Sequence, residues 1–424
     1  MFREFIPKSY HLLRSGYTFS TFRKDLVAGI TVGIIALPLA MAFAIASGAT
    51  PEQGLITAII AGFLISALGG SRVQIGGPTG AFVVLIYDII QRNGYPGLVV
   101  ATFIGGCLLI LFGIIRIGSW IKYVPHPLIT GFTAGIAVII FSSQIKDFFG
   151  LEMGVPPVHF IDKWKAYYEA LPTLHGTTLL LSSGTLFLII CIRRFIPKLP
   201  WGIAAIVMAT TCAYLFGLPV ETIYSKFGEI PSSIPIPSFP SLAIPDDKFF
   251  EIFIDGIAIA LLCGIESLLS AVIGDGLVGG QHKSNCELIG QGVANLAGLL
   301  FGGIPATGAI ARTAANVKSG AQTPVAGIIH AITLLLIMLF LAPVVSHIPL
   351  PALAAILIMV AWNMSEMKQF ISFLKAPVGN VLVLLVAFFL TVFVDITIAI
   401  TFGMLLAWFL SFVTQKQDEK KVTE

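Results

Sequence analysis

Residues 302–314 decide how this chain folds, and they read Gly-Gly-Ile-Pro-Ala-Thr-Gly-Ala-Ile-Ala-Arg-Thr-Ala. The stretch lies in an apolar region, yet it makes a poor membrane-spanning helix because a glycine pair and Pro305 interrupt it. A short helix of small residues is then expected, and it carries the full positive charge of Arg312. Residues 76–82 read Gly-Gly-Pro-Thr-Gly-Ala-Phe and repeat this pattern early in the chain. Two interrupted apolar segments in corresponding halves indicate the binding site of a transporter.

The composition predicts an all-α polytopic membrane protein. Hydrophobic residues make up 56% of the 424 residues and charged residues only 11%, whereas a soluble domain carries about 25% charged residues. Long apolar runs recur along the chain, which is typical of a helical bundle and not of a membrane barrel. No cleavable signal peptide is visible. The five cysteines form no close pair and are interpreted as small buried apolar residues: Cys107, Cys191, Cys212, Cys263 and Cys286.

Fourteen transmembrane segments are expected. They lie at residues 28–47, 55–69, 79–91, 97–115, 127–145, 177–192, 201–217, 250–273, 288–302, 308–317, 325–342, 351–364, 378–394 and 396–414. The basic N-terminal arm, residues 1–24, is cytoplasmic by the positive-inside rule, and an even number of segments returns the polar tail, residues 415–424, to the same side. We therefore expect a multi-pass protein of the cell (inner) membrane with both termini in the cytoplasm.

A Pro-rich extracytoplasmic loop, residues 221–248, divides the chain, because it holds too many prolines for a helix. It separates a first repeat of seven segments, residues 25–220, from a second, residues 249–414. Since seven is odd, the second repeat must be inverted relative to the first. Residues 158–172 are expected to form an interfacial helix in an outer loop, with the aromatic residues Trp164, Tyr167 and Tyr168.

The inversion makes the two interrupted segments, the third and the tenth, face each other as half-helices. The segment after Pro78 runs from the middle of the membrane outward, and the segment after Pro305 runs inward. Their N-termini therefore meet near the midplane, and each offers unpaired N–H groups and a partial positive charge. Two such N-termini form an anion site. The preceding residues, 73–75 and 301–304, are expected to be extended.

Arg312 and Glu266 are the charged residues at membrane depth that indicate chemistry. A buried arginine costs about 2.5–3.5 kcal/mol on insertion scales, so Arg312 either adds charge to the anion site or pairs with a carboxylate that holds its segment. Glu266 lies in the middle of a long apolar span. It either couples a proton or cation to transport or forms a static salt bridge with Arg312. Ser267 and Ser270 are placed to supply oxygen atoms to a coupling ion.

The uncharged residues at or near the two interrupted segments each have two possible interpretations. Thr79 and Thr307 are either the N-caps of the half-helices or substrate ligands, and Phe43 and Phe82 either pack in the interior or line the site. Further polar residues in the spans are expected to form interhelical hydrogen bonds: Asp88, Gln144, Gln291, Asn295 and His330. The sequence shows no phosphate-binding loop, no cysteine or histidine metal cluster and no nucleophile–base pair, so an enzyme is not expected. No nucleic-acid partner is expected either.

Over residues 20–414 the chain resembles the SulP family of anion transporters. The resemblance rests on Asp-Leu-Val-Ala-Gly-Ile-Thr-Val-Gly at 25–33 with Leu-Pro-Leu-Ala at 37–40, on residues 76–80, on Ser-Asn-Cys-Glu-Leu-Ile-Gly-Gln-Gly at 284–292, and on residues 308–316. The family implies a 7+7 inverted repeat. In it, a core of segments one to four and eight to eleven slides, elevator-like, against a gate of the other six. It also implies a homodimer.

Three stretches, residues 264–269, 309–312 and 359–366, look most like the bacterial C4-dicarboxylate branch of that family. In the bicarbonate branch an aspartate tends to occupy the position of Glu266 and a hydroxyl residue that of Ile310, an arrangement that suits sodium. Glu266 beside the apolar Ile310 favours a proton. The resemblance thus implies proton-coupled uptake of fumarate or succinate. Sulfate or bicarbonate transport, with protons or sodium, is the alternative; an anion channel or a nucleobase permease is less favoured.

Carried over by position, the family's anion site corresponds to a defined set of residues in this sequence: Phe43, Thr79, Gly80, Ala81, Phe82, Gly308, Ala309, Ile310 and Arg312, with Glu266, Ser267 and Ser270 for ion coupling. No cofactor is implied beyond the co-transported proton or sodium. Most relatives continue into a cytoplasmic STAS domain. Here only about ten residues follow the last segment, so no STAS domain is expected.

Overall fold

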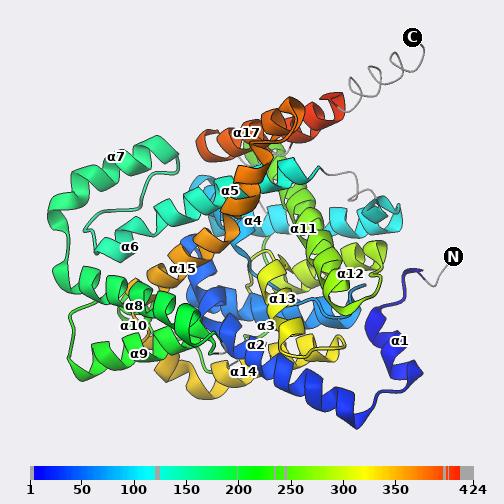
Figure 1. Ribbon diagram of the computed structural model, residues 1–424, viewed down its shortest axis with the longest axis horizontal. Helices are drawn as coiled ribbons and strands as arrows, with labels where there is room; N and C mark the ends of the chain where they lie inside the picture. The colour runs from blue at the N-terminus through cyan, green and yellow to red at the C-terminus, as the bar shows by residue number, and fades with distance from the viewer. Residues whose placement is uncertain are drawn as a thin grey trace.

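The computed structural model describes residues 4–119, 125–197, 199–233, 235–242, 246–394, 398–399 and 401–410, and these are mostly helical. The elements before the Pro-rich loop are α1 (Lys8–Ser15), α2 (Phe19–Ala46), α3 (Pro51–Leu68), β1 (Gly76–Gly77), α4 (Gly80–Ile114), α5 (His126–Ser143), α6 (Ile145–Phe149), α7 (Phe160–Ala170), η3 (Leu171–Thr173), α8 (Gly176–Phe195) and α9 (Trp201–Leu215). Figure 1 shows their arrangement.

The remaining elements are α10 (Ile223–Phe227), η4 (Asp246–Lys248), α11 (Phe249–Val278), α12 (Ser284–Leu300), β2 (Thr307–Gly308), α13 (Ile310–Lys318), α14 (Val325–Ser346), α15 (Leu350–Met364), α16 (Met367–Phe373) and α17 (Val378–Phe393). Residues 401–410 form one more helix. The two strands are only two residues long each, so the all-α class expected from the sequence is confirmed. Helix α7 lies where the interfacial helix is expected.

Eight helical stretches in the described residues are long and apolar enough to cross a membrane, and α9, α17 and residues 401–410 are shorter apolar helices. Large apolar side chains such as Leu180, Phe187 and Phe340 lie on the surface, where lipid can cover them. The third and fourth expected segments are joined in α4, which bends at Gly94 because that residue adopts a φ of 65°. A glycine tolerates this left-handed φ without steric cost.

Local sequence explains where several helices begin and corrects two predictions. Thr50 and Gln53 form reciprocal hydrogen bonds that start α3. Thr222 caps the short helix α10 in the same way, so the loop at 221–248 does contain a helix, formed ahead of its prolines. Within residues 301–304, which are expected to be extended, Phe301 and Gly302 instead form a turn, and the strand begins only at Thr307.

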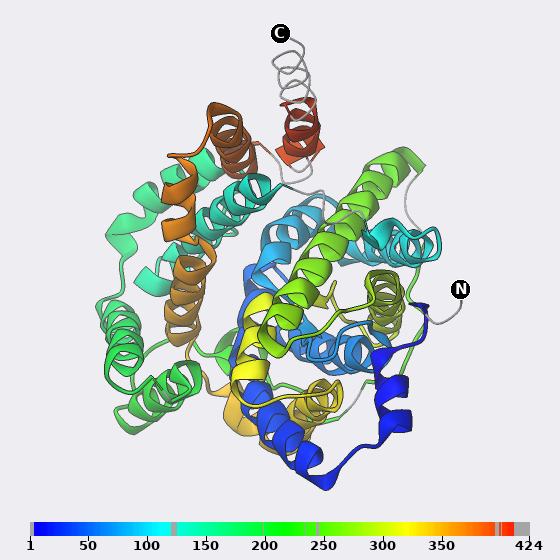
Figure 2. The same cartoon turned by 45° about the vertical axis from the view of Figure 1, so that its right-hand side comes forward.

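The helices pack into two groups, which we call the core and the gate. In the core, α4 packs on α11 and α12, while α14 packs on α2 and α3. In the gate, α5 packs on α15 and α17, and α8 packs on α9 and α15. Figure 2 shows the blue and yellow core helices on one side and most of the green and orange gate helices on the other. The expected division of the segments into core and gate therefore matches the packing.

The helix contacts also follow the expected inverted repeat. In an inverted repeat, α2 would correspond to α11, α3 to α12, and the second part of α4 to α14. The contact between α4 and α11 then matches the contact between α14 and α2. In the same way, the contact between α4 and α12 matches the contact between α14 and α3. In the gate, the pair α5 and α17 corresponds to α15 and α8. Each half thus buries its faces against the other half, so neither half forms its core alone.

Candidate anion-binding site

The two interrupted segments cross each other at the centre of the core. Strands β1 and β2 pair in antiparallel fashion, with Gly76 opposite Gly308 and Gly77 opposite Thr307. The backbone N–H of Ala309 donates to the carbonyl oxygen of Ile75 at 2.8 Å and extends the pairing. Because the strands are antiparallel, α4 and α13 begin at this crossing and leave it in opposite directions.

Hydroxyl groups of α11 hold the crossing in place. The Ser267 Oγ lies 2.7 Å from the Thr307 Oγ1 and accepts a hydrogen bond from the Gly308 N–H at 3.2 Å. One turn along, the Ser270 Oγ lies 2.9 Å from the Thr313 Oγ1, which also accepts from the Ile75 N–H at 3.1 Å. Ser267 and Ser270 therefore lie beside the crossing, where their hydroxyl groups already have protein partners.

Side chains that the sequence analysis did not assign to the site complete this support. The Asn295 side chain accepts a hydrogen bond from the Ala306 N–H at 2.8 Å and donates one to the Ala306 carbonyl at 2.9 Å. The Gln74 Nε2 donates to the Ser267 carbonyl, and the Asn316 Nδ2 donates to the Val73 carbonyl. Gln74 and Asn316 were detectable, because each is a polar residue directly beside an interrupted apolar segment.

The N-termini of the two half-helices differ in how they are capped. Thr79 occupies the N-cap position of α4, but its side chain makes no capping bond. Its Oγ1 is buried and has no hydrogen-bond partner in the described structure. At α13 the N-cap is Ala309, not Thr307. Since the first N–H groups of a helix lack intrahelical acceptors, Gly80 and Ala81 present free donors beside the Thr79 hydroxyl.

Arg312 extends from α13 to the N-terminus of α4. Its side chain is 3% exposed, and its Nη2 donates to the carbonyl of Pro78. Its Nη1 is buried and has no hydrogen-bond partner among the described residues. No carboxylate of the described residues forms an ion pair with Arg312. The guanidinium lies over Gly77, where an added Cβ would be 2.8 Å from the Nη1. The arginine of one half-helix thus adds its charge to the N-terminus of the other.

Two gate residues lie against this N-terminus. A Cβ added to Gly80 would lie 2.7 Å from the Met364 Sδ of α15 and 3.1 Å from the Ile140 Cδ1 of α5. Phe43, Ala81 and Phe82 are buried in the main hydrophobic cluster of the molecule. The structure therefore brings Thr79–Ala81 and Arg312 together, and it places the two phenylalanines in the surrounding apolar interior.

At the start of α13, burial decreases along the chain. Gly308 and Ala309 are buried, Ile310 is partly buried and Ala311 is exposed. The N–H groups of this helix end thus lie nearer to solvent than those of α4, whose first residues are buried. The two half-helix ends are therefore not equivalent, although the sequence pattern is the same at both.

Glu266 lies at the boundary between core and gate. It is 7% exposed and makes no ion pair or hydrogen bond with the described residues, so the alternative of a salt bridge to Arg312 is not realised. It lines a cavity of about 20 Å³ with Ile265 and Leu269 of its own helix and with four residues of α5: Leu128, Ile129, Phe132 and Thr133. A cavity of this volume holds about one water molecule.

Comparisons with known proteins find relatives over nearly the whole chain. The model of the sulfate permease family matches residues 22–387. A putative sulfate transporter of Bacillus subtilis, YvdB, is 45% identical over 96% of this chain and 76% of its own length. The bicarbonate transporter BicA of a Picosynechococcus species is 32% identical over 96% and 73%. The solved transmembrane domain of a cyanobacterial BicA superposes with a TM-score of 0.79 at 30% identity and covers 92% of this chain and 98% of that one.

Proposed function

This chain belongs to the sulfate permease family of anion transporters, and we propose that it is a secondary active carrier whose anion binds at the crossing of the half-helices. One observation carries the proposal. The Thr79 Oγ1 and the Arg312 Nη1 are both buried without an acceptor in the described structure. Buried donors are normally satisfied, and a bound anion would accept from both of them and from the N–H groups of Gly80 and Ala81.

A C4-dicarboxylate such as fumarate or succinate is the substrate we favour. Met364 and Ile140 lie against Gly80, and these apolar groups suit the carbon chain between two carboxylates better than they suit a hydrated inorganic ion. Sulfate and bicarbonate are the alternatives, because the relatives YvdB and BicA are named for them. The donors at the crossing fit any of these oxyanions.

We propose that Glu266 carries the coupling proton. The carboxyl group lacks an ionic partner in the described residues and faces the gate helix α5. A carboxylate without a partner at membrane depth is costly. It is less costly when protonated, and a carboxyl group that exchanges a proton as the core moves would couple transport to a proton gradient. Sodium coupling is the alternative.

The wider mechanism follows from the division into core and gate. We propose that the core slides as an elevator against the gate and carries the crossing from one side of the membrane to the other. The carrier would reside in the inner membrane with both termini cytoplasmic, and it would form a homodimer.

The test is uptake into proteoliposomes. Labelled fumarate, sulfate and bicarbonate are offered separately under an imposed pH gradient or sodium gradient. We expect the pH gradient to drive fumarate uptake, and Glu266→Gln to abolish the dependence on that gradient while leaving exchange at equal pH. Glu152→Gln, at an exposed position, is the matched control. If a proton gradient drives uptake of none of these anions, proton coupling is wrong.

A further inference from the structure

A second cavity, of about 750 Å³, lies between the core helices α2, α4 and α11 and the gate helices α5, α6 and α7, and residues of α10 also line it. We call it the vestibule. It reaches Val83 and Val84, one turn beyond the start of α4, but Thr79–Phe82 do not line it. The vestibule is therefore separate from the crossing and ends about one helical turn away from it.

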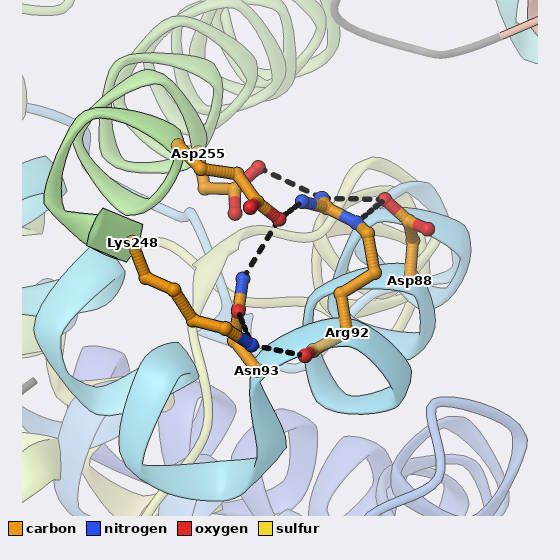
Figure 3. Close-up of polar contacts among 6 residues, drawn as sticks. Asp88, Arg92, Asn93, Lys248 and Asp255 are labelled. Carbon is orange, nitrogen blue, oxygen red and sulfur yellow. Dashed lines mark hydrogen bonds and ion pairs between the residues drawn. The ribbon is translucent and has the colours of Figure 1, made fainter. Parts of the chain in front are cut away.

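The carboxylates that line the vestibule already have cationic partners. The Arg92 Nη2 lies 2.6 Å from the Asp88 Oδ2 and 3.0 Å from the Asp255 Oδ1, and its Nη1 pairs with Glu251. Figure 3 shows this cluster, with Lys248 bonded to Asn93 and to the Arg92 carbonyl. Asp147 pairs with Lys226 at 3.4 Å. None of these carboxylates is paired with Lys163 of α7, which also lines the vestibule.

That lysine, Lys163, is 4% exposed and has no hydrogen bond or ion pair with any described residue. Its Nζ lies 5.2 Å from the ring centroid of Tyr87, a weak cation–π contact. Burial lowers the pKa of Lys163 to about 8, so the ammonium is still mostly charged at neutral pH. A buried charge without a counter-charge is unfavourable.

Tyr167 lies four residues further on, so it is on the same face of α7. It is 2% exposed, and its hydroxyl is buried with no partner among the described residues. Both residues line the vestibule. One helix thus places two donors without protein partners, one of them charged, at the wall of one cavity. The cavity is large enough for a small organic anion.

We propose that Lys163 and Tyr167 form a second anion site, in the vestibule, for a small oxyanion such as a carboxylate. Its anion accepts hydrogen bonds from the Lys163 Nζ and the Tyr167 hydroxyl and replaces the missing counter-charge. The position, between core and gate and beside the first turns of α4, makes it a capture site that holds an anion before it reaches the crossing. The site does not depend on the crossing, so the two are tested separately.

Equilibrium binding to the purified full chain tests the proposal, with radiolabelled fumarate and radiolabelled sulfate as separate probes. We expect the wild type to bind at least one of them at two classes of site. Lys163→Met removes one class, and Tyr167→Phe weakens the same class by about tenfold. Lys165→Met and Tyr168→Phe, at exposed positions of the same helix, leave both classes intact.

Arg312→Gln distinguishes the two sites. It is expected to weaken the class that remains in Lys163→Met about 10–100-fold and to spare the vestibule class. If the wild type binds neither anion outside the Arg312 class, or if folded Lys163→Met and Tyr167→Phe variants bind as the wild type does, the vestibule site does not exist. If only the Lys163 class is found, the vestibule site stands and the site at the crossing fails.

Discussion

Arg312 connects the two halves of the chain at the scale of single residues. It belongs to the second half-helix, yet its guanidinium lies against Gly77 and donates a hydrogen bond to the carbonyl oxygen of Pro78. Both of these residues immediately precede the first half-helix. A bound anion would therefore contact donors from both repeats. This arrangement explains why a buried arginine is retained without a carboxylate among the described residues: its counter-charge is the proposed substrate.

Replacing Arg312 by glutamine should weaken anion binding about 10–100-fold, because a charge-assisted hydrogen bond contributes about 1.5–3 kcal/mol. Arg312→Lys should recover part of the loss, since the charge returns without the planar fork. Titration of the purified protein with fumarate or sulfate measures the effect, and Arg194→Gln, at an exposed position, is the control. An unchanged affinity in folded Arg312→Gln would show that Arg312 only holds Pro78.

At the scale of elements, the crossing of β1 and β2 is possible because glycines occupy it. Gly77 adopts a φ of 144°, and a Cβ there would meet the Arg312 guanidinium. At Gly308 an added Cβ would collide with the Gln74 side chain. Two short strands therefore approach closely, and the free donors of α4 and the Arg312 guanidinium are held within one small volume.

Gly77→Ala should lower stability by about 1–3 kcal/mol, because the backbone conformation disfavours a side chain and the new methyl group displaces Arg312. The apparent unfolding temperature in detergent should fall, and anion binding should weaken with it. Gly184→Ala in α8 is the matched control, since no atom lies within 4 Å of its Cβ position. Equal unfolding temperatures of wild type and Gly77→Ala would mean that the crossing tolerates a side chain.

At the scale of the whole molecule, the core and the gate are separate packing units that meet where α4 packs on α5 and where α2 packs on α9 and α15. The helices α5 and α11 also face each other across a small cavity. Leu128 of α5 and Leu269 of α11 line the small cavity that also contains Glu266. In the proposed elevator, this boundary slides during each transport cycle. The proposed proton carrier thus lies where relative movement of the two units would change its surroundings.

A short bifunctional thiol reagent that bridges Leu128→Cys and Leu269→Cys should arrest uptake, with the five native cysteines replaced. The control joins Leu128→Cys to Gly403→Cys, because Gly403 contacts Leu128 from within the gate. That bridge should leave uptake intact. Uptake that continues across a completed bridge between Leu128→Cys and Leu269→Cys would exclude sliding at this boundary.

The sequence by itself determined the positions of the long apolar helices, the two interruptions and the burial of Arg312 and Glu266. These features depend on local hydrophobicity and on the backbone chemistry of glycine and proline, which need few neighbours to act. It also gave the family, because the motifs at 76–80, 284–292 and 308–316 are contiguous in the chain.

Only the tertiary structure decided which polar groups remain free. Thr79 and Thr307 look equivalent in sequence, but Thr307 is held by Ser267 whereas the Thr79 hydroxyl has no partner in the described structure. Likewise, Lys163 and Lys165 are neighbours in the chain, and only Lys163 faces the vestibule. Hydrogen bonds at the crossing join residues up to 243 positions apart in the chain. Whether a donor is satisfied is therefore a property of the assembled core, which no local pattern specifies.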